Sequence, residues 1–172
     1  MFGTFVGAPV RWVCERIVIT LALYRRIDDV QVGLAQPTGT VFLWGHVADA
    51  MALIRRLDHG AYFAVRNRAR RILVLPHRAT AEFWLLTRTI VLPQDEILKQ
   101  SAGATACDLV HESVHARLNS LARMAPRTVA RIEARCIREQ IALARKLSRE
   151  GYSNIDPYVE YLNECLRQHL EA

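Results

Sequence analysis

The 172-residue chain has little lysine and no closely spaced cysteines. Only two of its 23 basic residues are lysines, and its formal net charge is +6. This arginine surplus is typical either of an anion-binding surface or of codon bias in an arginine-rich genome. Cys14, Cys107, Cys136 and Cys165 form no Cys-x-x-Cys pair, which excludes a cysteine-only zinc knuckle and a thioredoxin-like site. We expect reduced, buried thiols and at most one disulfide in a cytoplasmic protein.

The chain also lacks a long uncharged segment. Residues 5–24 are apolar, but Arg11, Glu15 and Arg16 interrupt them. The uncharged run that follows, 17–24, is far shorter than the roughly 20 residues that a membrane-spanning helix needs. No basic region precedes the apolar part and no small-residue cleavage site follows it, so a signal peptide is not expected either.

An N-terminal amphipathic helix within residues 1–27 is predicted from apolar spacing. Proline suits the first helical turn, and Pro9 stands there. We expect the helix to pack through its apolar face, or alternatively to make peripheral membrane contact through residues 8–24. The side chains of this face are Val10, Val13, Cys14, Ile17 and Leu21.

A sheet region is expected over residues 40–93 of a single domain, 1–172. The chain has 51% apolar and 23% charged residues, as globular proteins do. It is also long enough to bury a hydrophobic core without disulfides or structural metals. The segments expected here are a strand at 41–44, a helix at 47–57 ending near Gly60, a hairpin of 61–65 with 72–75, and a strand at 87–92.

A helical region follows over residues 101–172. Apolar periodicity predicts helices at 105–124, at 126–149 closed by Gly151, and from Asp156 to the C-terminus. The expected fold class is therefore α+β, with a small mixed sheet followed by the helices.

The most informative motif is His-Glu-x-x-His at His111, Glu112 and His115, within a predicted helix. Residues four apart on a helix share a face, so two imidazoles can bind one metal ion. A glutamate beside the first histidine can take a proton from a water that the metal activates. The apolar stripe beside the histidines on a helical wheel consists of Cys107, Val110, Val114, Leu118 and Leu121.

The following helix offers a third ligand. Glu133 lies in the middle of its apolar face on a helical wheel, whereas Glu139 faces outward. A buried carboxylate is costly unless it is paired or coordinates a metal. Glu133 therefore either completes a metal site with His111 and His115, or pairs with a buried arginine or with Gln140 and a water.

This combination resembles the gluzincin type of zincin metalloprotease, in which a glutamate on the next helix completes the His-Glu-x-x-His site. The resemblance covers roughly residues 105–147 and includes the Ile-Glu-Ala step around Glu133. It implies an edge strand that pairs with extended substrate, for which 87–92 is the candidate. Two features differ from relatives: Glu133 follows His115 at a spacing of only 18 positions, and Ile137 stands where some have an aspartate.

The resemblance implies a metal site and a reaction. One Zn²⁺ ion would be held by His111, His115 and Glu133, with a fourth position left open. The protein would hydrolyse a peptide bond in a peptide or protein substrate, and Glu112 would act as general base.

Supporting residues are expected around such a site. Metal-bound histidines need a hydrogen-bond partner on the other ring nitrogen, and Asp108 or Asn119 could supply it. The alternative for Asp108 is a favourable charge near a helix N-terminus. The candidates for stabilising an oxyanion are Tyr152, Tyr158 and His169.

Other conspicuous residues are interpreted as structural. The tryptophans expected to anchor the core are Trp12, Trp44 and Trp84. The histidines expected to be solvated are His46, His59 and His77. Cys136 is expected in the core, with a place beside the zinc as the alternative.

A second class of function is a non-catalytic zincin-like interaction or regulatory module. Its basic surface would bind nucleic acid or an acidic protein partner. The arginines on the outward face of the 126–149 helix are Arg131, Arg135, Arg138, Arg145 and Arg149.

Overall fold

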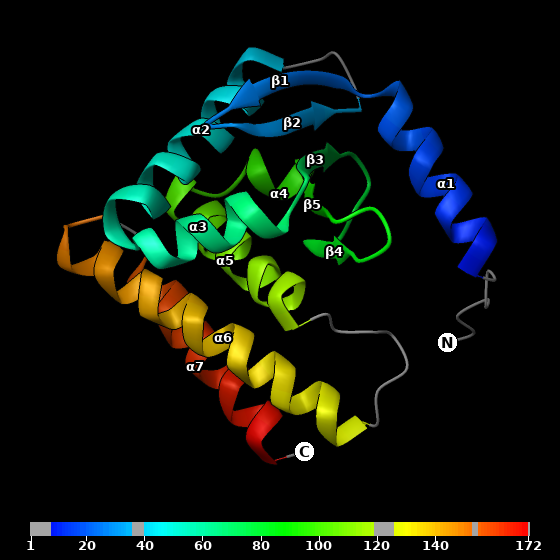
Figure 1. The fold of residues 1–172 in the computed structure, drawn as a ribbon. Helices are drawn as coiled ribbons and strands as arrows, with labels where there is room; N and C mark the ends of the chain where they lie inside the picture. Colours follow the sequence, from blue (N-terminus) through cyan, green and yellow to red (C-terminus); the bar gives the residue numbers. More distant parts are fainter. Residues whose placement is uncertain (1–7, 36–39, 119–125, 153–154, 172) are drawn as a thin grey trace.

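The computed structural model describes residues 8–35, 40–118, 126–152 and 155–171, and over these residues it confirms the α+β fold (Figure 1). The strands are β1 (Leu23–Ile27), β2 (Val30–Leu34), β3 (Arg71–Leu75), β4 (Glu82–Trp84) and β5 (Thr89–Pro93). The helices are α1 (Ala8–Leu21), α2 (Thr40–Leu57), α3 (His59–Arg68), α4 (Gln94–Ile97), α5 (Ala102–Leu118), α6 (Pro126–Arg149) and α7 (Asp156–Glu171).

The strands form one mixed sheet in the order β1-β2-β3-β5-β4. The three central strands are parallel, and β1 and β4 join as antiparallel edges. The N-terminal helix expected within residues 1–27 ends at Leu21, and the segment Leu23–Ile27 is instead the first strand of a hairpin that the sequence pattern does not predict. This hairpin turns at Asp28 and Asp29, whose φ angles are +46° and +66°, as a two-residue hairpin turn requires. Two aspartates signal this turn more weakly than Asn-Gly does.

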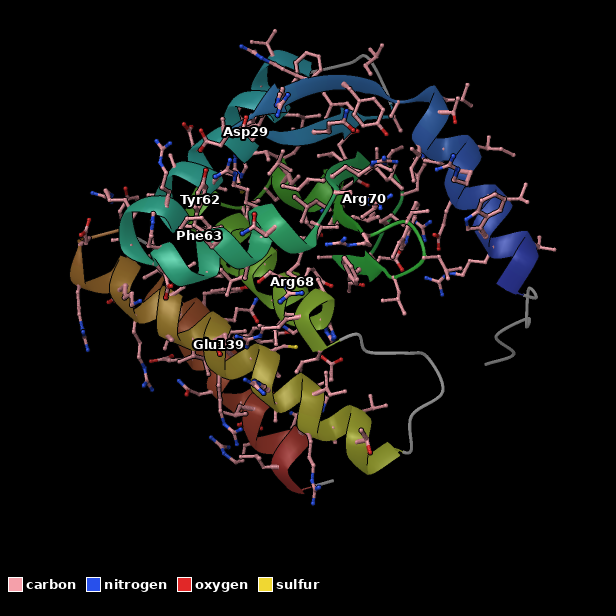
Figure 2. All side chains as sticks on the ribbon, in the orientation of Figure 1. Asp29, Tyr62, Phe63, Arg68, Arg70 and Glu139 are labelled. Carbon is pink, nitrogen blue, oxygen red and sulfur yellow. The ribbon has the colours of Figure 1, made fainter. Side chains whose placement is uncertain are left out.

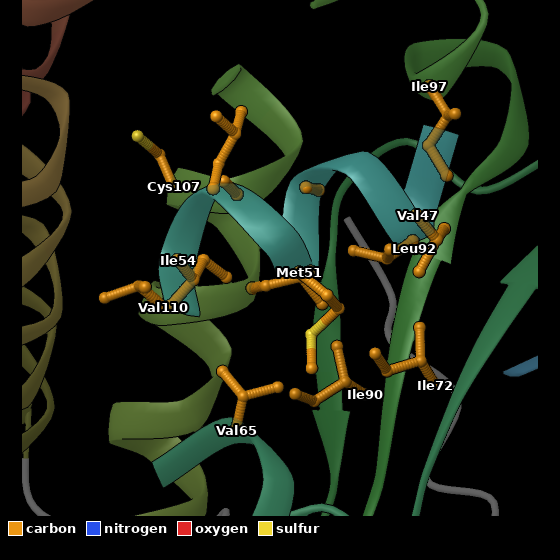
Figure 3. Packing of buried hydrophobic residues seen from close by; sticks show 14 of the residues in the cluster. Val47, Met51, Ile54, Val65, Ile72, Ile90, Leu92, Ile97, Cys107 and Val110 are labelled. Atoms are coloured by element: carbon orange, nitrogen blue, oxygen red, sulfur yellow. The ribbon is translucent and has the colours of Figure 1, made fainter. Parts of the chain in front are cut away.

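The main core lies between one face of the sheet and helices α2, α3 and α5 (Figure 3). Met51 and Ile54 of α2 meet Ile72 and Ile90 of the central strands there, and all four are fully buried. Val110 of α5 belongs to the same cluster, so packing of the sheet fixes the rotation of α5 about its axis.

The expected strand at 41–44 is wrong, because this segment is the first part of α2. Its β-branched and aromatic residues favour a strand locally, but Val41 and Phe42 are 78% and 55% exposed. Leu43 instead begins a buried series that continues through Val47 and Met51. This helical period matches the core, and burial outweighs local propensity.

The expected hairpin of 61–65 with 72–75 is also wrong in its first half. Residues 61–65 belong to α3, whose N-cap Asp58 accepts a hydrogen bond from the Ala61 amide at 2.9 Å. Because α2 ends at Leu57, Gly60 lies inside α3 and does not end the preceding helix. The strand at 72–75 is confirmed as β3.

Helix α1 lies on the opposite face of the sheet, but not through the expected side chains. Glu15 and Ile19 are buried, and Ile19 packs with Leu73 and Trp84. The Glu15 carboxylate accepts hydrogen bonds from Arg11 and Thr87, which turns this polar side inward. The face expected to pack is exposed, as Val10, Val13, Cys14, Ile17 and Leu21 show. Membrane contact through residues 8–24 stays a prediction.

The tryptophan and histidine expectations are met in part. Trp84 is buried and Trp44 packs against the core, but Trp12 is 46% exposed. His59 and His77 are exposed as expected. His46 is half-buried instead, and its Nε2 lies 2.9 Å from the Thr105 hydroxyl.

The C-terminal helices agree with their periodicity. Helices α6 and α7 begin and end close to the predicted positions and lie side by side (Figure 1). Gly151 has a φ of +77° just past α6, which suits a glycine C-cap. The part of the expected 105–124 helix beyond Leu118 lies outside the described residues. Among the described helices, none is sufficiently long and apolar to traverse a bilayer.

Candidate metal centre

Helix α5 carries the histidine motif, and its two sides have different surroundings. Ser101 caps it by accepting a hydrogen bond from the Ala104 amide at 3.2 Å. Cys107 and Val110 hold one side in the main core. The opposite side, with the motif residues, therefore faces helix α6 and a surface groove.

The groove has a volume of about 1190 Å³. One wall is formed by α1 and the segment 79–86, which includes β4, and the other by α6 and α7. His111, Glu112 and His115 lie between these walls, with Glu133 opposite them. The sequence-predicted base and metal ligands thus reach one solvent-accessible space.

The structure brings His111, His115 and Glu133 together. The two Nε2 atoms are 3.2 Å apart. One oxygen of Glu133 lies 3.4 Å from Nε2 of His111, and the other lies 3.3 Å from Nε2 of His115. Among the described residues, Glu133 therefore pairs with the two histidines and not with a buried arginine, which was the alternative.

These separations fit a zinc ion. Donors about 2.0–2.1 Å from zinc at tetrahedral angles are about 3.3 Å apart. The two imidazole nitrogens have this spacing, and each of them has it to one oxygen of Glu133, His111 to one oxygen and His115 to the other. All three side chains line the groove. Without a cation, protons shared between the imidazoles and the carboxylate satisfy the same groups.

The electrostatics of the cluster follow from burial and mutual contact. Hydrogen bonds from His111 and His115 hold the pKa of Glu133 far below its usual range. Burial lowers the pKa of His111, but the contact with Glu133 and the charge of Glu112 raise it above its usual value overall. Burial raises the pKa of Glu112 to about 7. Glu133 is thus an anion, while Glu112 can exchange a proton near neutral pH.

Cys136 offers an alternative third donor. Its sulfur and one nitrogen from each histidine all lie within 4.8 Å of one another. Burial raises the pKa of this thiol well above its ordinary value, so without a cation it carries its proton. Glu133 lies nearer to the histidines, with one oxygen 3.4 Å from His111 Nε2 and the other 3.3 Å from His115 Nε2.

Only some of the residues predicted to support the site lie in the groove. Asp108, Tyr158 and His169 line the groove. Tyr152 does not, because its hydroxyl accepts a hydrogen bond from Arg56 of α2. Asn119 lies outside the described residues.

Gln140 is the functional residue that sequence reasoning underrated. It is buried on α6, and its Oε1 lies 3.1 Å from Nδ1 of His111. Its Nε2 donates to Asp108 Oδ1 at 3.1 Å and to the Tyr158 hydroxyl at 2.6 Å. The available signal was a second polar residue on the inward face, two helical turns after Glu133.

No protein-family model, curated protein or solved structure matches this chain. The site is therefore interpreted from its own chemistry.

Proposed function

We propose that the protein is a zinc-dependent metallopeptidase. The observation that carries the proposal is the contact of the Glu133 carboxylate with both imidazoles: one oxygen lies 3.4 Å from Nε2 of His111, the other lies 3.3 Å from Nε2 of His115, and the two nitrogens are 3.2 Å apart. It supports a site with three protein ligands and one open position, the arrangement of catalytic rather than structural zinc.

When bound, a zinc ion would supply a Lewis acid that activates water and polarises a peptide carbonyl. Glu112 is adjacent to His111 on α5 and lines the groove. Its carboxylate accepts the proton of the attacking water and returns it to the leaving amine. A pKa near 7 suits both transfers.

The groove favours an extended peptide as substrate. Its volume of about 1190 Å³ exceeds the roughly 300–1,000 Å³ of small-molecule sites. The expected edge strand at 87–92 is wrong, because β5 is paired on both sides, by β3 and β4. The edge beside the groove is β4, which has no second strand partner among the described residues. An extended segment can pair with this edge.

The direct test is cleavage of a random peptide library by the zinc-loaded protein. We expect metal-dependent cleavage at a restricted set of sequences, lost with a chelator and restored by zinc. An equal cleavage pattern with and without chelator contradicts the proposal.

A basic surface favours a second candidate function, binding to nucleic acid. The exposed arginines on the outer face of α6 are Arg131, Arg135, Arg138, Arg145 and Arg149. None forms an ion pair with a carboxylate of the described residues, whereas Arg55 and Arg66 do, with Asp28 and Asp29. At about 1.5 Å per residue the row is about 27 Å long, which suits contact with successive phosphates. Glu139, which is labelled on the same helix in Figure 2, forms an ion pair with Arg117.

The salt dependence of DNA binding tests this candidate. Replacing Arg135, Arg138 and Arg145 by glutamine should reduce the slope of log K against log salt by about 2–3. The control replaces the ion-paired Arg55 and Arg66 and should leave the slope unchanged. Binding that is absent, or indifferent to salt, contradicts it.

For either function we propose a cytoplasmic location, because all four cysteines are free thiols.

A further inference from the structure

We infer that helix α1 docks the protein on an anionic lipid bilayer, lying flat on the surface with its outward apolar side inserted at the level of the headgroups. The helix lies at the margin of the molecule (Figure 1). It buries its one carboxylate against the sheet and leaves a stripe of large apolar side chains in solvent. Docking of this kind requires neither a metal ion nor peptidase activity.

Contacts with the sheet region hold α1 in this orientation. The Glu15 carboxylate is only 4% exposed and accepts a hydrogen bond from the Thr87 hydroxyl at 3.2 Å. Ile19, one turn later, is buried and packs with Leu73 of β3. Turning the helix to bury its apolar stripe would expose Ile19 and separate Glu15 from Thr87. The stripe therefore stays on the outside of the folded chain.

The outward side of α1 is a continuous apolar stripe. Its members recur three or four positions apart, so they share one side of the helix. These side chains, which are 47–75% exposed, are Val10, Val13, Ile17 and Leu21. Their transfer from water to the boundary between headgroups and acyl chains is favourable and is how helices that lie on a bilayer bind it.

Arginines border the stripe on both sides. At about 100° per residue, Arg11 lies about 100° from Val10 around the helix axis, and Arg16 lies about 120° from it in the other direction. Arg11 is bound to Glu15, whereas Arg16 forms no ion pair with a carboxylate of the described residues. Residues 8–26 contain four arginines, and their one carboxylate, Glu15, is buried. The exposed surface around the stripe is thus basic and complements anionic lipid headgroups.

Trp12 lies beside Arg16 at the edge of the stripe. It is 46% exposed, and the Arg16 guanidinium lies 5.6 Å from the centre of its ring. Both side chains line a surface depression together with Val13 and Ile17. Tryptophan is enriched where membranes meet water, because its ring is apolar and its N–H is polar. An exposed tryptophan next to an arginine therefore favours a bilayer as the partner.

A second copy of the chain fits the stripe less well. Helix α1 has 14 residues, so it is about 21 Å long and about 10 Å wide and offers roughly 200 Å². A stable protein interface buries roughly 800 Å² of each partner. Pairing two such helices would also bring their arginine borders together with no exposed carboxylate of residues 8–26 between them. A bilayer requires neither a large area nor a complementary shape.

Flotation of the full chain with lipid vesicles tests the inference. We expect binding to vesicles of phosphatidylcholine with phosphatidylserine and much weaker binding to phosphatidylcholine alone. Replacing Ile17 and Leu21 together by glutamine should weaken binding by at least about 100-fold, because two large apolar side chains no longer leave water. Arg16→Gln should weaken it about fivefold, the effect of one basic residue near an anionic surface.

The matched control replaces Val41 and Phe42 of α2 by glutamine. These side chains are 78% and 55% exposed, much like Leu21 and Ile17, but α2 covers the opposite face of the sheet. The control should float like wild type. Because the replaced side chains are exposed in both double variants, Tm should change little in either, which separates loss of binding from loss of folding.

Tryptophan fluorescence gives a second readout. Emission should shift to shorter wavelength when phosphatidylserine vesicles are added, and Trp12→Phe should lose the shift but still float, because Trp44 and Trp84 already pack in the protein. Absence of flotation, equal flotation with phosphatidylcholine alone, or undiminished flotation of the variant lacking Ile17 and Leu21 overturns the inference. A dimer that becomes monomeric in this variant assigns the stripe to a second copy and overturns it as well.

Discussion

Replacing Glu112 by glutamine is expected to lower kcat/KM of the zinc-loaded protein by about 10²–10⁴-fold, the usual contribution of a general base. Glutamine has nearly the same volume but cannot accept the proton of the attacking water. The side chain is only 5% exposed and faces the groove beside His111, so few water molecules can replace it. Zinc affinity should be unchanged, because the carboxylate is outside the His111, His115 and Glu133 donor set.

Single-turnover cleavage of a peptide identified from the library measures this effect, and zinc content is determined on the same samples. Glu139→Gln is the matched control, because Glu139 lies on α6 but pairs with Arg117 outside the groove. It should keep full activity. Undiminished cleavage by zinc-loaded Glu112→Gln would show that another group takes the proton.

Replacing His115 by alanine is expected to weaken zinc binding by about 10²–10³-fold. Zinc sites with four ligands have apparent binding free energies of about 10–16 kcal/mol, so one ligand contributes about 2.5–4 kcal/mol, and each 1.4 kcal/mol corresponds to a tenfold change in affinity. The two remaining donors, His111 and Glu133, lie 3.4 Å apart and can still hold a cation weakly.

Thermal unfolding with added zinc measures this loss, because a ligand that binds the native state stabilises it by about 2.7 kcal/mol at 100 times its Kd. Tm of the wild type should rise on zinc addition, and that of His115→Ala should not at the same concentration. His59→Ala removes an exposed histidine outside the groove and should respond like wild type. An equal rise in His115→Ala contradicts the ligand assignment.

Helical periodicity predicted the C-terminal half of the fold well, because the apolar faces of α6 and α7 repeat over many turns. The N-terminal half was less predictable. Residues 41–44 and 61–65 have β-prone compositions, but their helical spacing matches the core and burial decides the outcome. The first hairpin turns on two aspartates, and β4 has only three residues, too few to show an alternating pattern.

The candidate site could be predicted as far as single helices define it. The i, i+4 spacing of His111 and His115 places both histidines on the same face of one helix. A helical wheel likewise distinguishes Glu133, on the inward face of the next helix, from Glu139 on the outward face. The register between α5 and α6 sets the contact of Gln140 with His111, and the position of α7 brings Tyr158 to Asp108. These contacts depend on tertiary packing, so sequence assigned Asp108 directly to an imidazole and missed the amide between them.

X-ray absorption spectroscopy at the zinc edge of the zinc-loaded protein tests the donor set most directly. With His111, His115 and Glu133 as ligands, the spectrum should show one ion per chain with only nitrogen and oxygen neighbours at about 2.0–2.2 Å. Cys136→Ser should give the same spectrum. A sulfur neighbour at about 2.3 Å, lost in Cys136→Ser, or a chain that retains no zinc, would contradict the account.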